Sequence, residues 1–97
     1  MTDEPTQTFT NVWGALADTP EEAANLRLRG DLAMAIREVV ERWGQGQAQA
    51  ARRLGVTQRR LNDLLRGRLD RFSLDALIAL AERAQLAVEM RVGMPAE

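Results

Sequence analysis

The middle of the chain carries a spacing of small and apolar residues that suits a pair of crossed helices and few other structures. Ala51 lies where the two helices would cross, since a larger side chain there would push them apart. Gly55 supplies the backbone conformation that a tight turn needs. Leu61 and Leu64 would anchor the second helix on the core. The spacing therefore predicts a helix-turn-helix within residues 47–66.

Capping residues and apolar periodicity predict the other helices. Thr19, followed by Pro and two Glu, has the features of a helix start: a capping hydroxyl, Pro at the first position and a capping box. Thr57 and Ser73 can cap two further helices. The predicted helices span residues 20–42, 47–54, 58–66 and 74–84. We therefore expect an all-α fold, a compact bundle of about four to five helices in one domain over residues 19–85.

The two ends of the chain follow other patterns. Residues 1–18 are polar with scattered apolar side chains, and we interpret them as a loosely structured N-terminal arm. Residues 86–92 alternate apolar and polar side chains with the two-residue period of a β-strand. A lone strand leaves its backbone groups unpaired, so it must pair with an arm of its own chain or with the same strand of a second molecule. Residues 93–97 form a tail.

The charge is unevenly distributed, although the formal net charge is only −1. Residues 1–51 carry four Arg against eight acids (−4), and residues 72–97 carry two Arg against four acids (−2). Residues 52–71 carry seven Arg against two Asp (+5), and all 13 basic residues of the chain are Arg. This basic block favours a nucleic-acid partner, because neutralising phosphates releases counterions. The alternative is a solvated arginine-rich face with no ligand.

The composition excludes several classes of chemistry. The chain has no Cys and no His, and its one Ser is Ser73. Thiol and imidazole catalysis, zinc fingers and disulfide scaffolds need residues that it lacks, and no His can activate Ser73. We expect no enzyme activity, no metal and no cofactor. No apolar run is long enough to cross a membrane, and the acidic N-terminus differs from a secretory signal, so we expect a cytoplasmic protein.

Three segments carry a resemblance to a known family: Gln47–Ala51, Leu54–Gln58 and Leu64–Ser73. They are similar to XRE/Cro-type helix-turn-helix regulators, and to the branch of these that includes HigA-like antitoxins. The similarity extends over about residues 11–92, and its most specific part is the run from Arg66 to Ser73. Two positions depart from the pattern. Gly46 stands where the family usually has Ser or Thr as a helix cap, and Arg60 stands where many relatives have Pro.

The resemblance implies roles for individual side chains of the second motif helix and its surroundings. The implied base-reading residues are Gln58, Arg59, Asn62 and Asp63. The implied phosphate-binding residues are Gln47, Thr57, Arg60, Arg66 and Arg68. The chemistry agrees, because Gln can pair with adenine, Arg with guanine, and an acid with the amino group of cytosine. Asp63 has an alternative role as an ion-pair partner of Arg59 or Arg60 on its own helix.

The favoured hypothesis is a homodimeric, sequence-specific transcriptional repressor that reads an inverted repeat in double-stranded DNA. The candidate dimer contacts are Leu86, Val88, Met90 and Val92. The resemblance further implies the antitoxin of a type II toxin–antitoxin system, which would neutralise a RelE/HigB-like toxin and repress their shared operon. One alternative is a stand-alone or phage-type repressor without a toxin. The other is a protein-interaction module that does not bind DNA.

Overall fold

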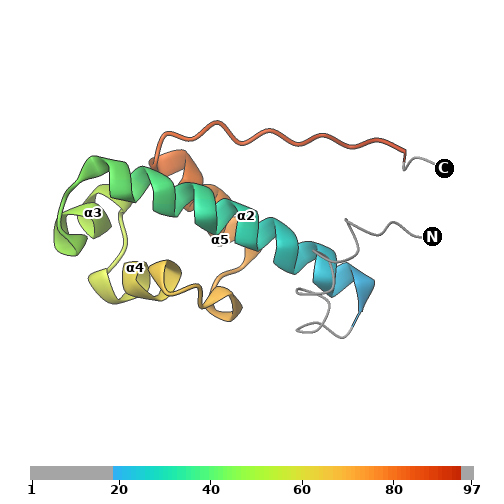
Figure 1. Cartoon of the computed structure of the whole chain (residues 1–97), viewed down its shortest axis with the longest axis horizontal. Coiled ribbons are helices and arrows are strands. Elements are labelled where there is room, and N and C mark those ends of the chain that lie inside the picture. The colour runs from blue at the N-terminus through green and yellow to red at the C-terminus, as the bar shows by residue number, and fades with distance from the viewer. Residues whose placement is uncertain (1–18, 95–97) are drawn as a thin grey trace.

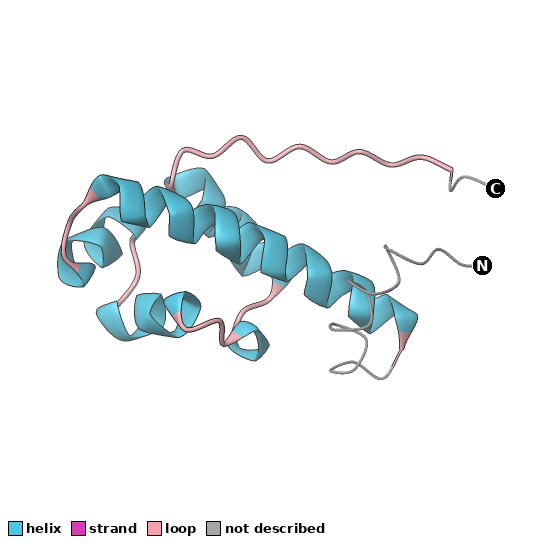
Figure 2. Cartoon of the chain, viewed as in Figure 1, coloured by secondary structure: helices cyan, strands magenta, loops and turns pink. Residues whose placement is uncertain are grey.

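The computed structural model describes residues 19–94, so the predicted arm over residues 1–18 and the last three residues of the tail lie outside the described residues. Within that range the chain forms four α-helices and one 3-10 helix, with no β-strand (Figures 1 and 2). The elements are α2 (Pro20–Trp43), α3 (Gln47–Leu54), α4 (Gln58–Leu65), η1 (Leu69–Arg71) and α5 (Leu74–Arg83). The all-α fold is confirmed, and each predicted helix ends within one residue of its observed end.

Short polar side chains start three of the four helices, as predicted. The hydroxyls of Thr19, Thr57 and Ser73 each accept a hydrogen bond from the backbone N–H three residues later, at 3.0, 3.0 and 3.1 Å. Each bond satisfies one of the N–H groups that a helix start leaves without a partner. Gly46 stands at the start of α3 and provides no such side-chain bond.

The long helix α2 packs against two of the other three helices. α2 runs along the length of the molecule in Figure 1 and packs mainly on α5, with further contacts to α4 and η1. α3 packs on α4 and on α5. Their buried side chains form a single core that includes Ile36, Leu54, Leu61, Phe72 and Leu77. No helix within residues 19–94 combines the length and the hydropathy that crossing a membrane requires.

Three of the helices end in the same hydrogen-bonded turn, in which the chain reverses through a left-handed residue. The left-handed residues after α3, α4 and α5 are Gly55, Gly67 and Gln85, with φ of 74°, 75° and 63°. The backbone N–H of the next residue donates to a carbonyl in the last turn of the helix. These bonds join Val56 to Ala51 (2.9 Å), Arg68 to Asp63 (3.0 Å) and Leu86 to Ala81 (2.9 Å). The turn predicted at Gly55 is therefore confirmed.

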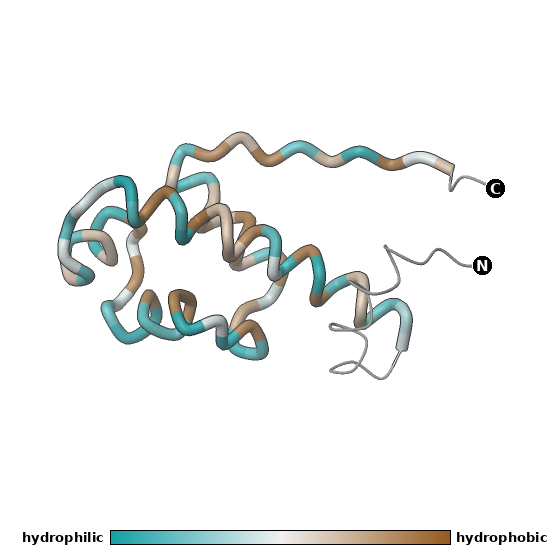
Figure 3. Tube along the Cα trace, viewed as in Figure 1, coloured by the Kyte–Doolittle hydropathy of each residue, from teal (hydrophilic) through white to brown (hydrophobic). Residues whose placement is uncertain are grey.

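The C-terminal segment, residues 86–94, is extended but forms no strand in the described chain. It leaves the end of α5 and stands apart from the helices in Figure 2, with the alternating hydropathy of a strand visible in Figure 3. Leu86 packs against the core of its own chain, whereas Met90 and Val92 are 85% and 83% exposed. No other described segment lies beside it to complete a β-ladder. The predicted pairing with a second molecule stays a prediction.

Candidate nucleic-acid interface

The exposed face of α4 carries most of the predicted base-reading residues. Gln58 and Arg59 are exposed in its first turn, and Asn62 is half-buried one turn later. These three side chains, with Asp63 and Arg68, border an open hollow of about 430 Å³. The leucines on the opposite face attach α4 to the core. α4 therefore turns its N-terminal polar residues outward, as a helix that enters a major groove must do.

Arg59 and Arg66 leave their guanidinium groups uncommitted at the two ends of α4. Both side chains are exposed, and neither makes a hydrogen bond or an ion pair within residues 19–94. A free guanidinium is a planar fork of donors that matches guanine or a phosphate. The structure thus keeps available one predicted base-reading arginine and one predicted phosphate-binding arginine.

Two of the predicted phosphate-binding residues lie at helix N-termini. Gln47 is the exposed first residue of α3, and the exposed Thr57 precedes α4. The Oγ1 atom of Thr57 accepts a bond from the N–H of Arg60, which leaves the hydroxyl hydrogen of Thr57 able to donate. Helix N-termini favour anions, because their N–H groups and the helix dipole both point toward the ligand.

Asp63, also predicted to read a base, is not exposed like Gln58 and Arg59. It is only 7% exposed, and its Oδ1 atom accepts bonds from Nη1 of Arg68 (3.0 Å) and of Arg71 (3.3 Å). The predicted intrahelical partners, Arg59 and Arg60, make no bond to it. The reason is the turn after α4, which brings two later arginines back over the last turn of the helix.

The charge state of Asp63 follows from this pairing. Burial raises the pKa of the Asp63 carboxyl, but the hydrogen bonds and positive charges of Arg68 and Arg71 outweigh burial. Its pKa therefore lies below the ordinary value of 3.8. The carboxylate is ionised at neutral pH, with two positive side chains arranged around it.

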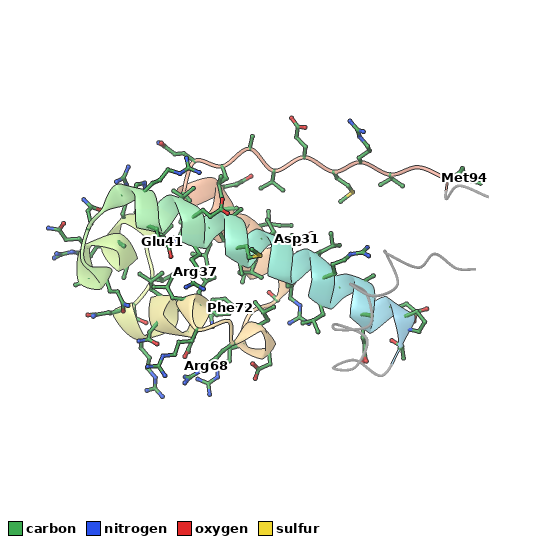
Figure 4. The ribbon with its side chains drawn as sticks, viewed as in Figure 1. Asp31, Arg37, Glu41, Arg68, Phe72 and Met94 are labelled. Atoms are coloured by element: carbon green, nitrogen blue, oxygen red, sulfur yellow. The ribbon has the colours of Figure 1, made fainter. Side chains whose placement is uncertain are left out.

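Arg60, a predicted phosphate ligand, makes two contacts within its own chain. Its guanidinium lies over the ring of Phe72, 4.1 Å from the ring centre, and Nη1 donates to the carbonyl of Arg71 at 2.7 Å. Figure 4 shows Phe72 on the side of α4 that faces α2, whereas Arg68 lies on the opposite, outer side. Arg60 thus joins α4 to the loop before α5.

Two further arginines brace the motif in a way that the sequence did not indicate. From α2, Nη1 of Arg29 donates to the carbonyls of Leu69 (2.6 Å) and Phe72 (3.1 Å). From α5, Nη1 of Arg83 donates to the carbonyls of Leu54 (3.1 Å) and Gly55 (3.3 Å). These partners are 28 to 43 residues apart in the sequence, so no local spacing could have revealed them.

The comparisons with known proteins agree with this architecture. A family described as a helix-turn-helix domain matches residues 15–93, which is more than half of the chain. No curated protein matches the chain. The crossed helices α3 and α4, their tight turn at Gly55 and the outward polar face of α4 are the parts that such a domain requires. The chain therefore belongs to the family of helix-turn-helix domains.

Proposed function

We propose that this protein is a sequence-specific regulator that binds double-stranded DNA through α4. The observation that carries the proposal is the exposed face of α4, where Gln58, Arg59 and Asn62 face outward from a helix whose other face is buried. Amide and guanidinium groups can form paired hydrogen bonds with adenine and guanine in the major groove. Because α2 and α3 pack against the buried side of α4, its exposed face is the part of the motif that can enter the groove.

The distribution of charge supports the same proposal. The +5 balance of residues 52–71 coincides with the helix-turn-helix and its following loop. Arg59 and Arg66 are exposed and unpaired among the described residues, so their charges are available to phosphates. Each phosphate that the protein neutralises releases counterions, which makes the affinity depend steeply on salt.

The test is a titration of the full chain with the DNA that lies upstream of its own reading frame, compared with random DNA of equal length. Fluorescence anisotropy at several salt concentrations gives the affinity and its salt dependence. Arg59→Ala should cost about 1–3 kcal/mol on the upstream DNA and reduce the preference over random DNA. Arg66→Ala should weaken both DNAs alike and lower the salt slope by about 1. Equal and weak binding of the two DNAs by the unmodified protein would exclude a sequence-specific regulator.

The regulator is further proposed to act as a homodimeric repressor. Residues 88–94 expose a row of apolar side chains, and their extended backbone has no partner among the described residues. Pairing with the same segment of a second copy would cover those side chains and satisfy the backbone groups. A two-fold dimer would read two half-sites about 34 Å apart, or one turn of DNA.

The antitoxin role is a narrower proposal, and it is supported by the resemblance of the segment Arg66–Ser73 to HigA-like antitoxins. The partner would be a small RelE/HigB-like toxin that this chain neutralises. The test is co-expression with the product of the adjacent reading frame. Growth arrest by that product alone, relieved by this chain together with formation of a complex, would support the antitoxin. A harmless neighbour would leave a stand-alone repressor.

A further inference from the structure

The turn after α4 differs from the two similar turns of the chain in the residue that follows its left-handed position. After α3 and α5 this residue is apolar, and both Val56 and Leu86 pack against the core. Such a contact usually accompanies this type of turn. After α4 the same position holds Arg68, which forms an ion pair with Asp63, the residue whose carbonyl accepts its N–H. A charged pair thus replaces the usual apolar contact at the turn that directly follows α4.

The ion pair leaves most of the N–H donors of Arg68 without a partner among the described residues. The side chain of Arg68 is 42% exposed, whereas that of Asp63 is 10% exposed. Within the described residues the side chain of Arg68 donates only from Nη1, and a guanidinium has five N–H donors. Arg68 borders the same hollow as Gln58 and Arg59. Its free donors therefore lie beside the base-reading residues and point away from α2 (Figure 4).

Arg71 completes the arrangement from the other side. Its Nη1 atom lies 3.3 Å from both carboxylate oxygens of Asp63, so Asp63 is held between two cations. This double contact restricts the carboxylate, and the carboxylate in turn restricts the long side chain of Arg68. An arginine that is already ordered loses less conformational entropy when it binds a phosphate.

We propose that Asp63 is a positioning residue for DNA binding, which holds Arg68 at the end of α4 so that its free donors meet a backbone phosphate. The proposal rests on the proposed function, because it assigns a role within the DNA interface. It makes Asp63 a residue that strengthens binding to every DNA sequence. It differs from the interpretation in which Asp63 accepts a bond from a cytosine and thereby selects one base pair.

The proposal predicts an effect opposite in sign to that of simple electrostatics. Replacing Asp63 by Asn removes a negative charge from the interface, which by itself should strengthen DNA binding. If Asp63 positions Arg68, Asp63→Asn should instead weaken binding roughly tenfold on any DNA, the effect of one charge-assisted hydrogen bond. Asp70→Asn is the matched control, since Asp70 is exposed and unpaired among residues 19–94 and loses the same charge. This control should bind DNA as tightly as the unmodified protein or more tightly.

Two further variants separate positioning from general damage to the fold. Asp63→Glu keeps a carboxylate within reach of Arg68 and should recover most of the lost affinity. In a double-mutant cycle, Asp63→Asn should weaken binding much less when it is combined with Arg68→Gln, because no arginine is left to position. A purely structural defect would persist in the Arg68→Gln background.

The measurement uses anisotropy on upstream and random DNA, with folding checked by circular dichroism. Equal binding by Asp63→Asn and Asp70→Asn would overturn the positioning role, and so would a loss of preference confined to one base pair. If Asp63→Asn does not fold, Arg68→Gln is compared with Arg42→Gln, which removes the same charge from an exposed position of α2. Equal DNA affinity for these two variants would also overturn it. Absence of binding by the unmodified protein would instead refute the proposed function.

Discussion

Arg29 and Arg83 show how single residues of this chain hold the helix-turn-helix and its following loop in place. Each lies on a helix outside the motif and donates to two backbone carbonyls. The carbonyls that accept from Arg29 lie between α4 and α5, and those that accept from Arg83 lie at the end of α3. Carbonyls at helix ends and in loops have no partner within a helix, and a cation that donates to them is a strong substitute. The basic residues therefore divide into arginines that brace the fold and arginines that remain free for a ligand.

Asp63 carries the pH dependence that can be predicted at the residue scale. The pKa of Asp63 is lowered in the folded chain. Its contribution to stability is therefore fully present above pH 3.8, which is the ordinary pKa of this carboxyl in the unfolded chain. That contribution is lost as the pH falls through the lower folded value. The unmodified protein should therefore lose more unfolding free energy than Asp63→Asn between about pH 5 and pH 2. Urea unfolding at several pH values measures the unfolding free energy of both proteins. The unmodified protein should be the more stable at pH 5, and the gap between the two should shrink as the pH falls.

The control for this prediction is Asp70→Asn, which removes a carboxylate that makes no ion pair among the described residues. Its unfolding free energy should follow that of the unmodified protein through the acid range. A constant gap between the unmodified protein and Asp63→Asn at every pH would contradict the prediction. Such a gap would mean that Asp63 does not titrate differently in the folded and unfolded chains.

At the scale of elements, the turns after α3 and α4 offer a matched pair of glycines. Gly55 and Gly67 have nearly the same backbone conformation, with φ of 74° and 75°. A Cβ atom at Gly67 would meet nothing within 4 Å, whereas one at Gly55 would collide with the guanidinium of Arg83. The two positions therefore share the cost of a left-handed non-glycine residue and differ only in their surroundings.

We expect Gly67→Ala to lower the unfolding free energy by about 1 kcal/mol, the cost of backbone strain alone. Gly55→Ala should cost more, by about 1–3 kcal/mol, because Arg83 must also give up its bonds to the end of α3. Chemical denaturation of both variants measures this difference. It should largely disappear when Arg83 is replaced by Ala, since the obstructing guanidinium is then gone. Equal effects of the two glycine substitutions would show that Arg83 moves aside without cost.

At the scale of the whole molecule, the C-terminal segment carries four of the six large hydrophobic side chains that are exposed in the described chain. Val88, Met90, Val92 and Met94 are all exposed there, and the intervening residues are mostly charged or small. A row of this kind on a small protein marks a surface that another molecule covers. The proposed dimer gives each protomer one α4, so that two copies of the same interface would act on one stretch of DNA.

The proposed dimer predicts a clear difference between the two faces of this segment. Met90→Asp places a charge on the apolar face and should shift the protein to a monomer in sedimentation velocity at micromolar concentration. Ala87→Asp places the same charge on the opposite face and should leave the dimer intact. The monomeric variant should also bind upstream DNA much more weakly, since it loses the second half-site. A monomeric unmodified protein, or equal effects of both substitutions, would exclude pairing through this segment.

The helices could be predicted from the sequence because the signals that start and stop them act over very short distances. A Thr or Ser cap bonds an N–H three residues away, and Gly55 and Gly67 stop their helices through their own backbone conformation. The buried leucines of α4 follow equally from helical spacing. These local effects also place Gln58 and Arg59 on the exposed face of α4. Most of the candidate interface could therefore be predicted from the sequence.

The sequence by itself therefore determined the class of fold, the helix-turn-helix and the basic block that surrounds it. Only the tertiary structure decided which charged side chains remain free. Asp63 pairs with Arg68 and Arg71 because the turn after α4 folds the chain back, whereas helical spacing had pointed to Arg59 and Arg60. The partner of a long charged side chain depends on which segments meet in space, and the contacts that position it cross turns and join distant helices. The structure of the C-terminal segment likewise depends on which segments meet in space, because a β-strand forms only where a second strand can pair with its backbone groups.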